Sequence, residues 1–398
     1  MDGQADIGDS PAKAAKPGPA ISRLQTRKPL SLGARLRQWR NDLIASAKFR
    51  NQMLRFPGTR WLAQRKANAL FRLTAGFVFS QILSACVTLG VLDRLRRGIL
   101  STDALAEACH LAPARMRLLL EQAERLGLIR HAGRDHWTLA DAGTVVAADA
   151  GLKAMIEHHC LFYRDLDRPA ELFGTAERDT ELKRYWAYAR CPDPSGIETE
   201  TANAYSGLMR SSQAMMADCI LAAHDFGRYE SILDVGGGDG TFLATAAAAY
   251  PDLKLQLFDL PPVIELARQR FAESCLVERI EFHSGDFAKA PVPASADCVC
   301  LTRVLCDHDD DRVLTILTNL HGSLKSGTRI MVAEAMAGKT EGARLAAVYF
   351  NLYFLAMGSG KCRTDNEIRN LLKSAGFRRP YTIATASPLL ATLVFATR

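Results

Sequence analysis

No Cys-x-x-Cys pair occurs among the ten cysteines of this 398-residue chain, and the two closest cysteines are Cys298 and Cys300. This spacing excludes a zinc finger and the disulfide framework of a small secreted protein, so we expect buried, reduced thiols and no metal site. The first twenty residues lack the apolar core of a signal peptide. We therefore expect residues 1–30 to be disordered and the protein to be cytoplasmic.

Acidic residues are almost missing between Arg23 and Arg72. This stretch, which we call the basic arm, holds thirteen Arg or Lys and a single acid, Asp42, for a net charge of +12. Apolar side chains such as Trp39 and Trp61 interleave with the cations. The pattern suits an anionic membrane surface or nucleic acid, and it fits a solvated helical extension equally well.

Charged residues are absent from the 18 residues between Ala75 and Leu92, a length that approaches a membrane span. Polar residues interrupt the run, among them Gln81 and Ser84, and it contains two glycines. We therefore expect a helix over residues 71–95 that is buried in a homodimer.

Residues 101–150 have the pattern of a winged helix. A short helix, TDALAEAC, and a longer one, ARMRLLLEQAERLG, precede two short strands in LIRHAGRDHWTLA. A DNA-reading helix needs unopposed cations, but Glu121 and Glu124 offset the arginines of the longer helix. We interpret the element as structural and expect no specific nucleic-acid partner. A ligand-sensing DNA-binding regulator is the competing class.

The rest of the chain divides into a helical stretch and an α/β region. Residues 151–225 are mostly helical, with a break at CPDPSG (191–196), and we expect them to bridge two domains and to line a substrate site. From residue 226 onward, five β-rich runs alternate with helix-length segments, which predicts a doubly wound parallel sheet. The last run, PYTIATASPLLATLVFATR, predicts an antiparallel hairpin that closes the sheet. The expected domains are thus 31–150, 151–225 and 226–398.

Candidate cofactor ligands follow the first three of these strands. A glycine-rich loop, DVGGGDG (234–240), precedes a helix, so backbone N–H groups can approach a ligand closely. Asp259 ends the second strand and can accept ribose hydroxyls, which NAD would satisfy as well. After the third strand, Asp286 can accept the adenine amino group and Phe287 can pack on the ring. This third signal favours S-adenosylmethionine as the cofactor, and an NAD-dependent dehydrogenase is the alternative interpretation.

Residues 65–398 resemble the small-molecule O-methyltransferases that include acetylserotonin and plant phenolic enzymes. The matching segments are ILDVGGGDGTF, LQLFDLPPVIE, HSGDF, LTRVLCDHDDD and GSGKCRTDNEIRNLLKSAGF. The resemblance implies a dimerising winged-helix domain followed by a Rossmann-like domain that binds S-adenosylmethionine. It places the following residues at the cofactor: Asp234, Gly236, Gly237, Gly238, Asp259, Leu260, Asp286, Phe287 and Arg303.

The sequence departs from that family at the catalytic base. Phenol-methylating members carry a His-Asp-Trp motif after strand four, where this chain has Cys306-Asp307-His308. Of the two glutamates that flank the family's histidine, Glu334 is kept and Cys362 replaces the other. A thiol has an ordinary pKa of about 8.5 and is inert when buried, so it would not replace the histidine. Either another residue of this chain acts as the catalytic base, or the reaction does not need a strong base.

The candidate catalytic residues are accordingly His308, Asp307, Glu334 and Cys306. His158 and His159 are candidates for binding the substrate and for the displaced base, and they could equally be helix residues at a domain junction.

A narrower resemblance connects the segments LGARLRQWRNDLIAS, EHHCLFYRDL and YFLAMGSGKCR with the hydroxyneurosporene-type O-methyltransferases of purple photosynthetic bacteria. These methylate the tertiary C-1 hydroxyl of an acyclic carotenoid. The resemblance implies a hydrophobic substrate, and a peripheral contact of the basic arm with the photosynthetic or inner membrane. Phenols and chlorin pigments are the alternative substrates.

Overall fold

The computed structural model describes residues 31–174, 178–189 and 213–398. The disordered stretch expected at 1–30 and the break expected at 191–196 lie outside these residues. The chain divides into two compact units, Met1–Phe77 and Val78–Arg398.

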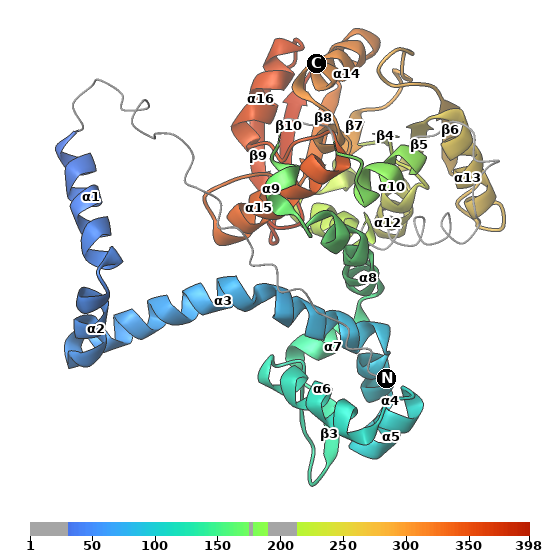
Figure 1. The fold of residues 1–398 in the computed structure, drawn as a ribbon. Helices are drawn as coiled ribbons and strands as arrows, with labels where there is room; N and C mark the ends of the chain where they lie inside the picture. Colours follow the sequence, from blue (N-terminus) through green and yellow to red (C-terminus); the bar gives the residue numbers. More distant parts are fainter. Residues whose placement is uncertain (1–30, 175–177, 190–212) are drawn as a thin grey trace, which may run out of the picture. The chain divides into compact units, whose positions relative to one another are not determined.

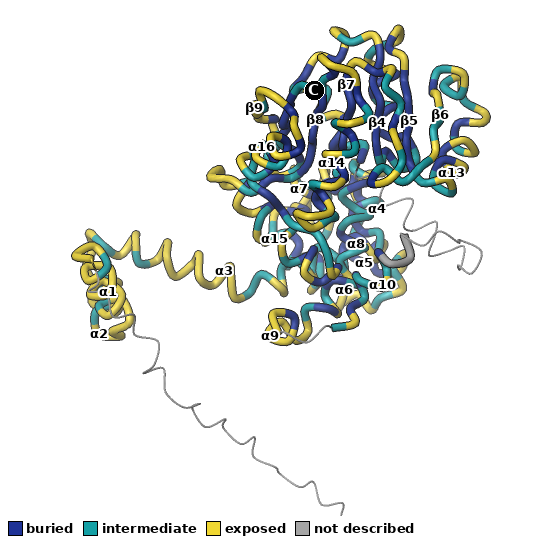
Figure 2. The backbone as a smooth tube through the Cα atoms, turned by 90° about the horizontal axis from the view of Figure 1, so that it is seen from above, coloured by how far each residue is buried: buried dark blue, intermediate teal, exposed yellow. Residues whose placement is uncertain are grey.

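The first unit consists of α1 (Leu32–Ala45), α2 (Ala47–Arg55) and the beginning of α3 (Pro57–Thr88). Side chains cap the first two helices: Ser31 and Ser46 accept the N–H groups of the first turns, and Arg50 donates to the carbonyl of Ala45 at 2.6 Å. No residue of α1 or α2 is buried, and Figure 2 shows these helices largely exposed. Local capping rather than a core therefore holds their ends.

The prediction of a single helix over residues 71–95 was wrong. α3 begins earlier, because Pro57 suits a first helical turn, and it ends at Thr88. Gly90 then takes a φ of 64°, which ends the helix, and α4 (Val91–Arg97) follows. Of α3, only Cys86 and Val87 are buried. By length and composition alone α3 could cross a membrane, since an 18-residue window has a mean hydropathy of 1.6.

The second unit opens with the winged helix. Its elements are β1 (Leu100–Ser101), α5 (Thr102–Ala108), α6 (Pro113–Arg125), β2 (Ile129–His131), β3 (His136–Leu139) and α7 (Asp141–Ala148). Trp137 fills the core with its ring and donates its indole N–H to the Thr102 hydroxyl at 2.9 Å, so the one polar atom of the side chain is satisfied. The helices α8 (Ala150–Asp165), α9 (Pro169–Leu172) and α10 (Glu181–Ala189) follow.

A seven-stranded sheet with the order β6-β5-β4-β7-β8-β10-β9 forms the rest of the unit (Figure 1). The first five strands of that order are parallel, and β10 and β9 are antiparallel, as expected from the hairpin pattern. The strands are β4 (Ser231–Val235), β5 (Lys254–Asp259), β6 (Ile280–Ser284), β7 (Cys298–Thr302), β8 (Arg329–Glu334), β9 (Arg378–Ala384) and β10 (Thr392–Thr397). The doubly wound α/β fold is confirmed.

Helices bury both faces of this sheet. They are α12 (Thr241–Ala249), α13 (Pro261–Phe271), α14 (Asp310–Ser323) and α16 (Asp365–Ser374), whereas α15 (Glu341–Met357) packs against α8 and α10. In β4, Leu233 and Val235 join the core under α14 and α16, whereas Ile232 joins the core under α12 and α13. Burial on both faces explains why the strands are continuous apolar runs. The carboxyl ends of the parallel strands meet at one edge, and the candidate site lies there.

Candidate active site

The glycine loop after β4 is fixed by sterics. Gly236 and Gly238 have φ values of 70° and 60°, which only glycine adopts without strain. A Cβ on Gly236 would lie 2.8 Å from the Val304 side chain, and one on Gly237 would lie 2.3 Å from the Asp234 carboxylate. The loop thus leaves backbone, not side chains, against the site, and α12 begins directly after it.

Asp234 is completely buried beneath this loop. Neither of its carboxylate oxygens has a hydrogen-bond partner in the described part of the chain. Burial, followed by the charge of Asp259, raises the pKa of Asp234 to about 8. A buried carboxylate without a donor is costly. S-adenosylmethionine carries an ammonium and a sulfonium group, and this orphaned acceptor therefore fits that cofactor.

Asp259 ties the glycine loop to the end of β5. Its carboxylate accepts the N–H of Gly238 at 2.9 Å and that of Leu260 at 2.7 Å. Burial raises the pKa of Asp259 to about 6, and the two N–H groups oppose that rise. A carboxylate has about four acceptor positions, so it can hold these donors and still accept ribose hydroxyls.

Asp286 and Phe287 follow β6, as expected, but the two side chains have different neighbours. The Asp286 carboxylate accepts the N–H of Ala288 at 2.9 Å and lies 3.5 Å from the cations of both Lys289 and Arg312. The Phe287 ring would lie 3.4 Å from a Cβ on Gly236, beside the glycine loop. The position of Phe287 suits stacking on a flat ring. The adenine contact of Asp286 stays a prediction.

The loop after β7 carries Cys306-Asp307-His308, which the resemblance aligns with the family's base motif. Arg303 has a φ of 57° and donates its N–H to Ala333, which turns the chain out of the strand. Cys306 follows in a 3₁₀ turn (Leu305–Asp307) and donates its N–H to Glu334 at 3.0 Å. Burial, with the negative charges of Asp307 and Glu334, raises the pKa of the Cys306 thiol well above its ordinary value. The thiol therefore stays protonated.

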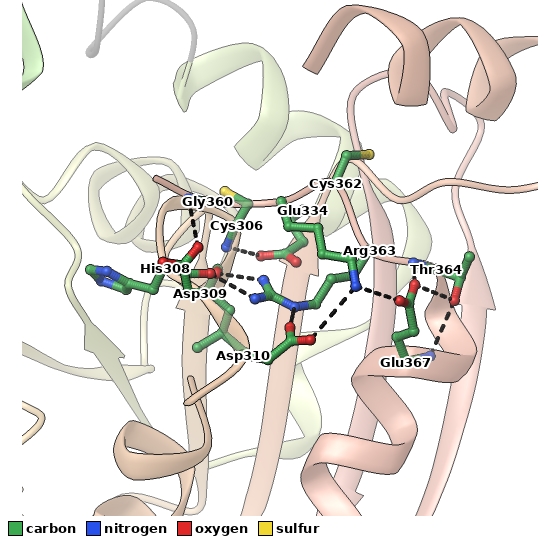
Figure 3. A network of polar contacts seen from close by, with 12 residues as sticks. Cys306, His308, Asp309, Asp310, Glu334, Gly360, Cys362, Arg363, Thr364 and Glu367 are labelled. Atoms are coloured by element: carbon green, nitrogen blue, oxygen red, sulfur yellow. Dashed lines mark hydrogen bonds and ion pairs between the residues drawn. The ribbon is translucent and has the colours of Figure 1, made fainter. Parts of the chain in front are cut away.

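Glu334 ends β8 and is fully buried beside Cys306. One of its oxygens accepts the Cys306 N–H, and the other has no partner among the described residues. Burial raises the pKa of Glu334 to about 7, although Arg363 opposes that rise. Cys362 donates its thiol to the carbonyl of Ala335 at 3.4 Å, and burial raises its pKa to about 12. Figure 3 shows Cys306, Glu334 and Cys362 grouped together.

Arg363 anchors this loop and was missed by the sequence interpretation. Its side chain is fully buried and donates to Asp310 at 2.7 Å, to the Leu305 carbonyl at 2.8 Å and to the His308 carbonyl at 2.6 Å (Figure 3). It therefore fixes both ends of the turn that holds Cys306. The sequence offered only an arginine within a matching motif, with no sign of its partners.

His308 points away from Cys306. In Figure 3 its ring lies on the far side of the loop, and its centroid is 6.2 Å from that of Phe287. His308 is thus placed with the predicted adenine site rather than with Glu334.

His158 and His159 lie on α8 and each pairs with a tyrosine of α15. The Nε2 of His158 is 2.7 Å from the Tyr353 hydroxyl, and that of His159 is 2.8 Å from the Tyr349 hydroxyl. The indole N–H of Trp186 donates to Tyr353 at 2.9 Å, so Tyr353 can donate its own proton to His158. Burial, with a smaller effect of His159, lowers the pKa of His158 to about 4; burial also lowers that of His159. Both imidazoles are neutral.

These pairs belong to an apolar, aromatic cluster built by four helices, α8, α9, α10 and α15, and by the two cysteines. We call it the acceptor cluster. Its buried members are Phe162, Leu172, Leu182, Trp186, Cys306, Tyr353, Phe354, Ala356, Met357 and Cys362, and Tyr349 packs against them. The thiols at the positions of the family's base and the two histidine–tyrosine pairs thus share one apolar cluster of buried side chains.

Among the described residues, no group of three or more His, Cys, Asp or Glu side chains could hold a metal ion.

Comparison with known families gives two matches. Residues 193–378 match an O-methyltransferase domain, and residues 71–149 match an O-methyltransferase dimerisation domain. The second match supports a homodimer and gives the winged helix a role in dimerisation.

Curated relatives cover most of the chain. A demethylspheroidene O-methyltransferase of Cereibacter sphaeroides is 38% identical over 89% of this chain and 93% of its own length. One from Rhodobacter capsulatus is 37% identical over 86% of this chain and 85% of its own length. An acetylserotonin O-methyltransferase of Rattus norvegicus is 29% identical over 81% of this chain and 76% of its own length.

Solved structures share the fold. Human N-acetylserotonin methyltransferase in complex with its cofactor matches with a TM-score of 0.69 and 25% identity, over 84% of this chain and 97% of that one. A methyltransferase of calicheamicin biosynthesis matches with a TM-score of 0.71 and 24% identity, over 84% and 98%.

Proposed function

This chain belongs to the S-adenosylmethionine-dependent small-molecule O-methyltransferase family, and from that premise we propose that it methylates the tertiary C-1 hydroxyl of an acyclic carotenoid. The likeness to two demethylspheroidene O-methyltransferases, at 38% and 37% identity, supports this acceptor over a phenol or a chlorin pigment.

The observation that carries the proposal is the chemistry at positions 306 and 362. Both thiols are buried, and both have a raised pKa. Neither can take a proton from a phenol before methyl transfer, as a histidine base can. A tertiary alcohol is far too weakly acidic to be ionised beforehand by any side chain, so the loss of that histidine costs such a substrate little.

The surroundings of the two thiols suit an apolar substrate. The acceptor cluster offers ring faces from Phe162, Tyr349 and Phe354, and its polar atoms are engaged with one another in the histidine–tyrosine pairs. A polyene can pack on such rings without leaving a buried polar group unpaired. A polar phenol ring would gain less there.

Alignment supplies the rate in this mechanism. S-adenosylmethionine, when bound, provides an electrophilic methyl group on its sulfonium. Asp234 and Asp259 hold the cofactor, while Arg363 fixes the turn whose Cys306 borders the acceptor cluster. These residues would hold the acceptor oxygen close to the methyl group and exclude water from the site, which would lower the barrier without a strong base.

The histidine–tyrosine pairs can take the proton that the reaction releases. Attack of the neutral alcohol forms the C–O bond, breaks the C–S bond and leaves a protonated ether, an acid far stronger than imidazolium. Tyr349 can accept that proton on its oxygen while passing its own to His159. The lowered pKa of His159 is no obstacle, because even a weak base removes a proton from so strong an acid.

The proposal is tested by offering the purified protein labelled S-adenosylmethionine with a panel of acceptors. Methyl transfer to a 1-hydroxylated acyclic carotenoid, with little transfer to phenols or chlorins, is the expected result. Transfer to phenols or chlorins alone would overturn it, while leaving the family assignment intact.

A further inference from the structure

The described part of the basic arm, residues 31–72, carries ten Arg or Lys and one acid. None of these cations forms an ion pair with a described acid. Two of them have local contacts: Arg50 caps the end of α1, and Arg65 lies 5.7 Å from the ring centre of Trp61. The remaining guanidinium and ammonium groups are thus held by no counter-charge that the structure describes.

Large apolar side chains on the same helices are exposed. In α1, Leu32, Leu36 and Trp39 have 77%, 58% and 63% of their surface exposed. Helical periodicity puts these three on one face, with Arg35 and Arg40 on either side. Farther along, Phe56 and Trp61 are each 65% exposed. The arm therefore presents an apolar stripe bordered by cations.

We propose that α1, α2 and the beginning of α3 form a docking surface for an anionic lipid bilayer. Leu32, Leu36 and Trp39 enter the boundary between headgroups and acyl chains, and the flanking arginines pair with lipid phosphates. The match to the dimerisation domain begins only at residue 71, so this surface lies outside the segment that the family uses to pair its protomers. The inference does not depend on which acceptor the enzyme methylates.

Charge and apolar content together favour a lipid surface over other occupants. Nucleic acid would pair with the cations but would leave the stripe of Leu and Trp in water. A second copy of the arm has the same positive charge and would repel the first.

A membrane span is also disfavoured. Although a window of α3 is long and apolar enough to cross a membrane, the charge-free part of the helix after Arg72 is only sixteen residues long, short of the roughly 20 apolar residues of a typical span.

The test uses full-length protein with vesicles of phosphatidylcholine, alone or mixed with phosphatidylserine. We expect sedimentation with the mixed vesicles only, release by high salt, and a blue shift of tryptophan emission as exposed Trp39 and Trp61 enter the lipid. The triple variant Arg35→Gln/Arg37→Gln/Arg40→Gln should bind about a hundredfold more weakly, because each cation near an anionic surface contributes about fivefold to affinity.

A matched variant, Arg228→Gln/Lys339→Gln/Arg344→Gln, removes three exposed cations outside the arm and outside the dimerisation domain and should bind like the parent protein. Trp39→Ser should weaken binding and reduce the blue shift while the melting temperature stays unchanged. Equal binding by both triple variants would overturn the proposal, as would binding that resists high salt. If the parent protein binds no vesicles and the arm variant no longer dimerises, the surface is a contact between protomers. If the parent protein binds DNA but no vesicles, the surface binds nucleic acid.

Discussion

The two halves of the active site are built in different ways. Apart from Arg303, the candidate residues of the cofactor half come from one continuous stretch, from Asp234 to Phe287, and lie at or just after the ends of parallel strands. The acceptor half joins α8, α10, the turn at Leu305–Asp307, α15 and the segment around Arg363. The first half keeps the family's chemistry, whereas the second has lost its histidine. The proposed carotenoid acceptor would thus be a change of substrate on an unchanged cofactor site.

Removal of Arg363 should have the largest effect, because the turn of the acceptor half depends on it. Arg363→Met removes a donor from the carbonyls of Leu305 and His308 and from the Asp310 carboxylate, although Leu305 still accepts the His308 N–H and Asp310 still lies 3.6 Å from Lys361. We expect a loss of about 3–5 kcal/mol in the free energy of unfolding. Urea titration measures it, with Arg344→Met, an exposed arginine of α15, as the control. Equal stability of the two variants would show that the turn is held by other contacts.

Asp259→Ala should weaken the cofactor half alone. Loss of the carboxylate frees the Gly238 N–H and removes the acceptor for the ribose, so we expect affinity for S-adenosylmethionine to fall by roughly 1–3 kcal/mol. Calorimetry measures the affinity, and Asp252→Ala, an exposed acid of the same domain, serves as the control. Unchanged affinity would refute the proposed site.

Tyr349→Phe should slow methyl transfer without changing the binding of the cofactor. The substitution keeps the ring that stacks on Tyr353 and removes the hydroxyl that contacts His159. We expect kcat to fall about tenfold, less than the ~10²–10⁴-fold of typical general-base removal, because the protonated ether is so acidic. The dissociation constant of the cofactor should not change. Tyr381→Phe on β9 is the matched control, and an unaltered kcat in Tyr349→Phe would show that water takes the proton directly.

The pH dependence of stability should reveal the buried acid of the cofactor half. Because burial raises the pKa of Asp234 to about 8, the folded protein retains a proton that the unfolded chain releases at lower pH. The free energy of unfolding of the cofactor-free protein therefore falls as the pH rises from about 4 toward 8. Asp234→Asn should remove this pH dependence, so its free energy of unfolding relative to that of the parent protein should rise by about 3 kcal/mol between about pH 5.5 and about pH 8.5. Urea unfolding at both pH values tests this, and parallel pH profiles would contradict it.

The sequence predicted the positions of the candidate cofactor residues in the fold far better than the contacts of the acceptor half, for a physical reason. A loop such as Gly236–Gly238 can be identified because φ values above zero and close backbone contacts need glycine, and ligands gather where parallel strands end. The partners of Arg363 lie more than fifty residues away, and those of His158 and His159 almost two hundred. No local pattern encodes such pairs. The break at Gly90 was missed because the local pattern was misleading: the apolar run continues through Gly90, although the positive φ of this residue ends the helix.

The most direct test of the account is the turnover of Cys306→Ser with a 1-hydroxylated acyclic carotenoid, measured beside Cys362→Ser, His308→Ala and Glu334→Ala. Because no strong proton acceptor is lost with either thiol, both serine variants should keep kcat within about tenfold of the parent protein. A loss of ~10²–10⁴-fold in His308→Ala, with cofactor affinity preserved, would place the base at His308 instead of the histidine–tyrosine pairs. A collapse of activity in Cys306→Ser alone would make the thiol a direct participant and would contradict the account.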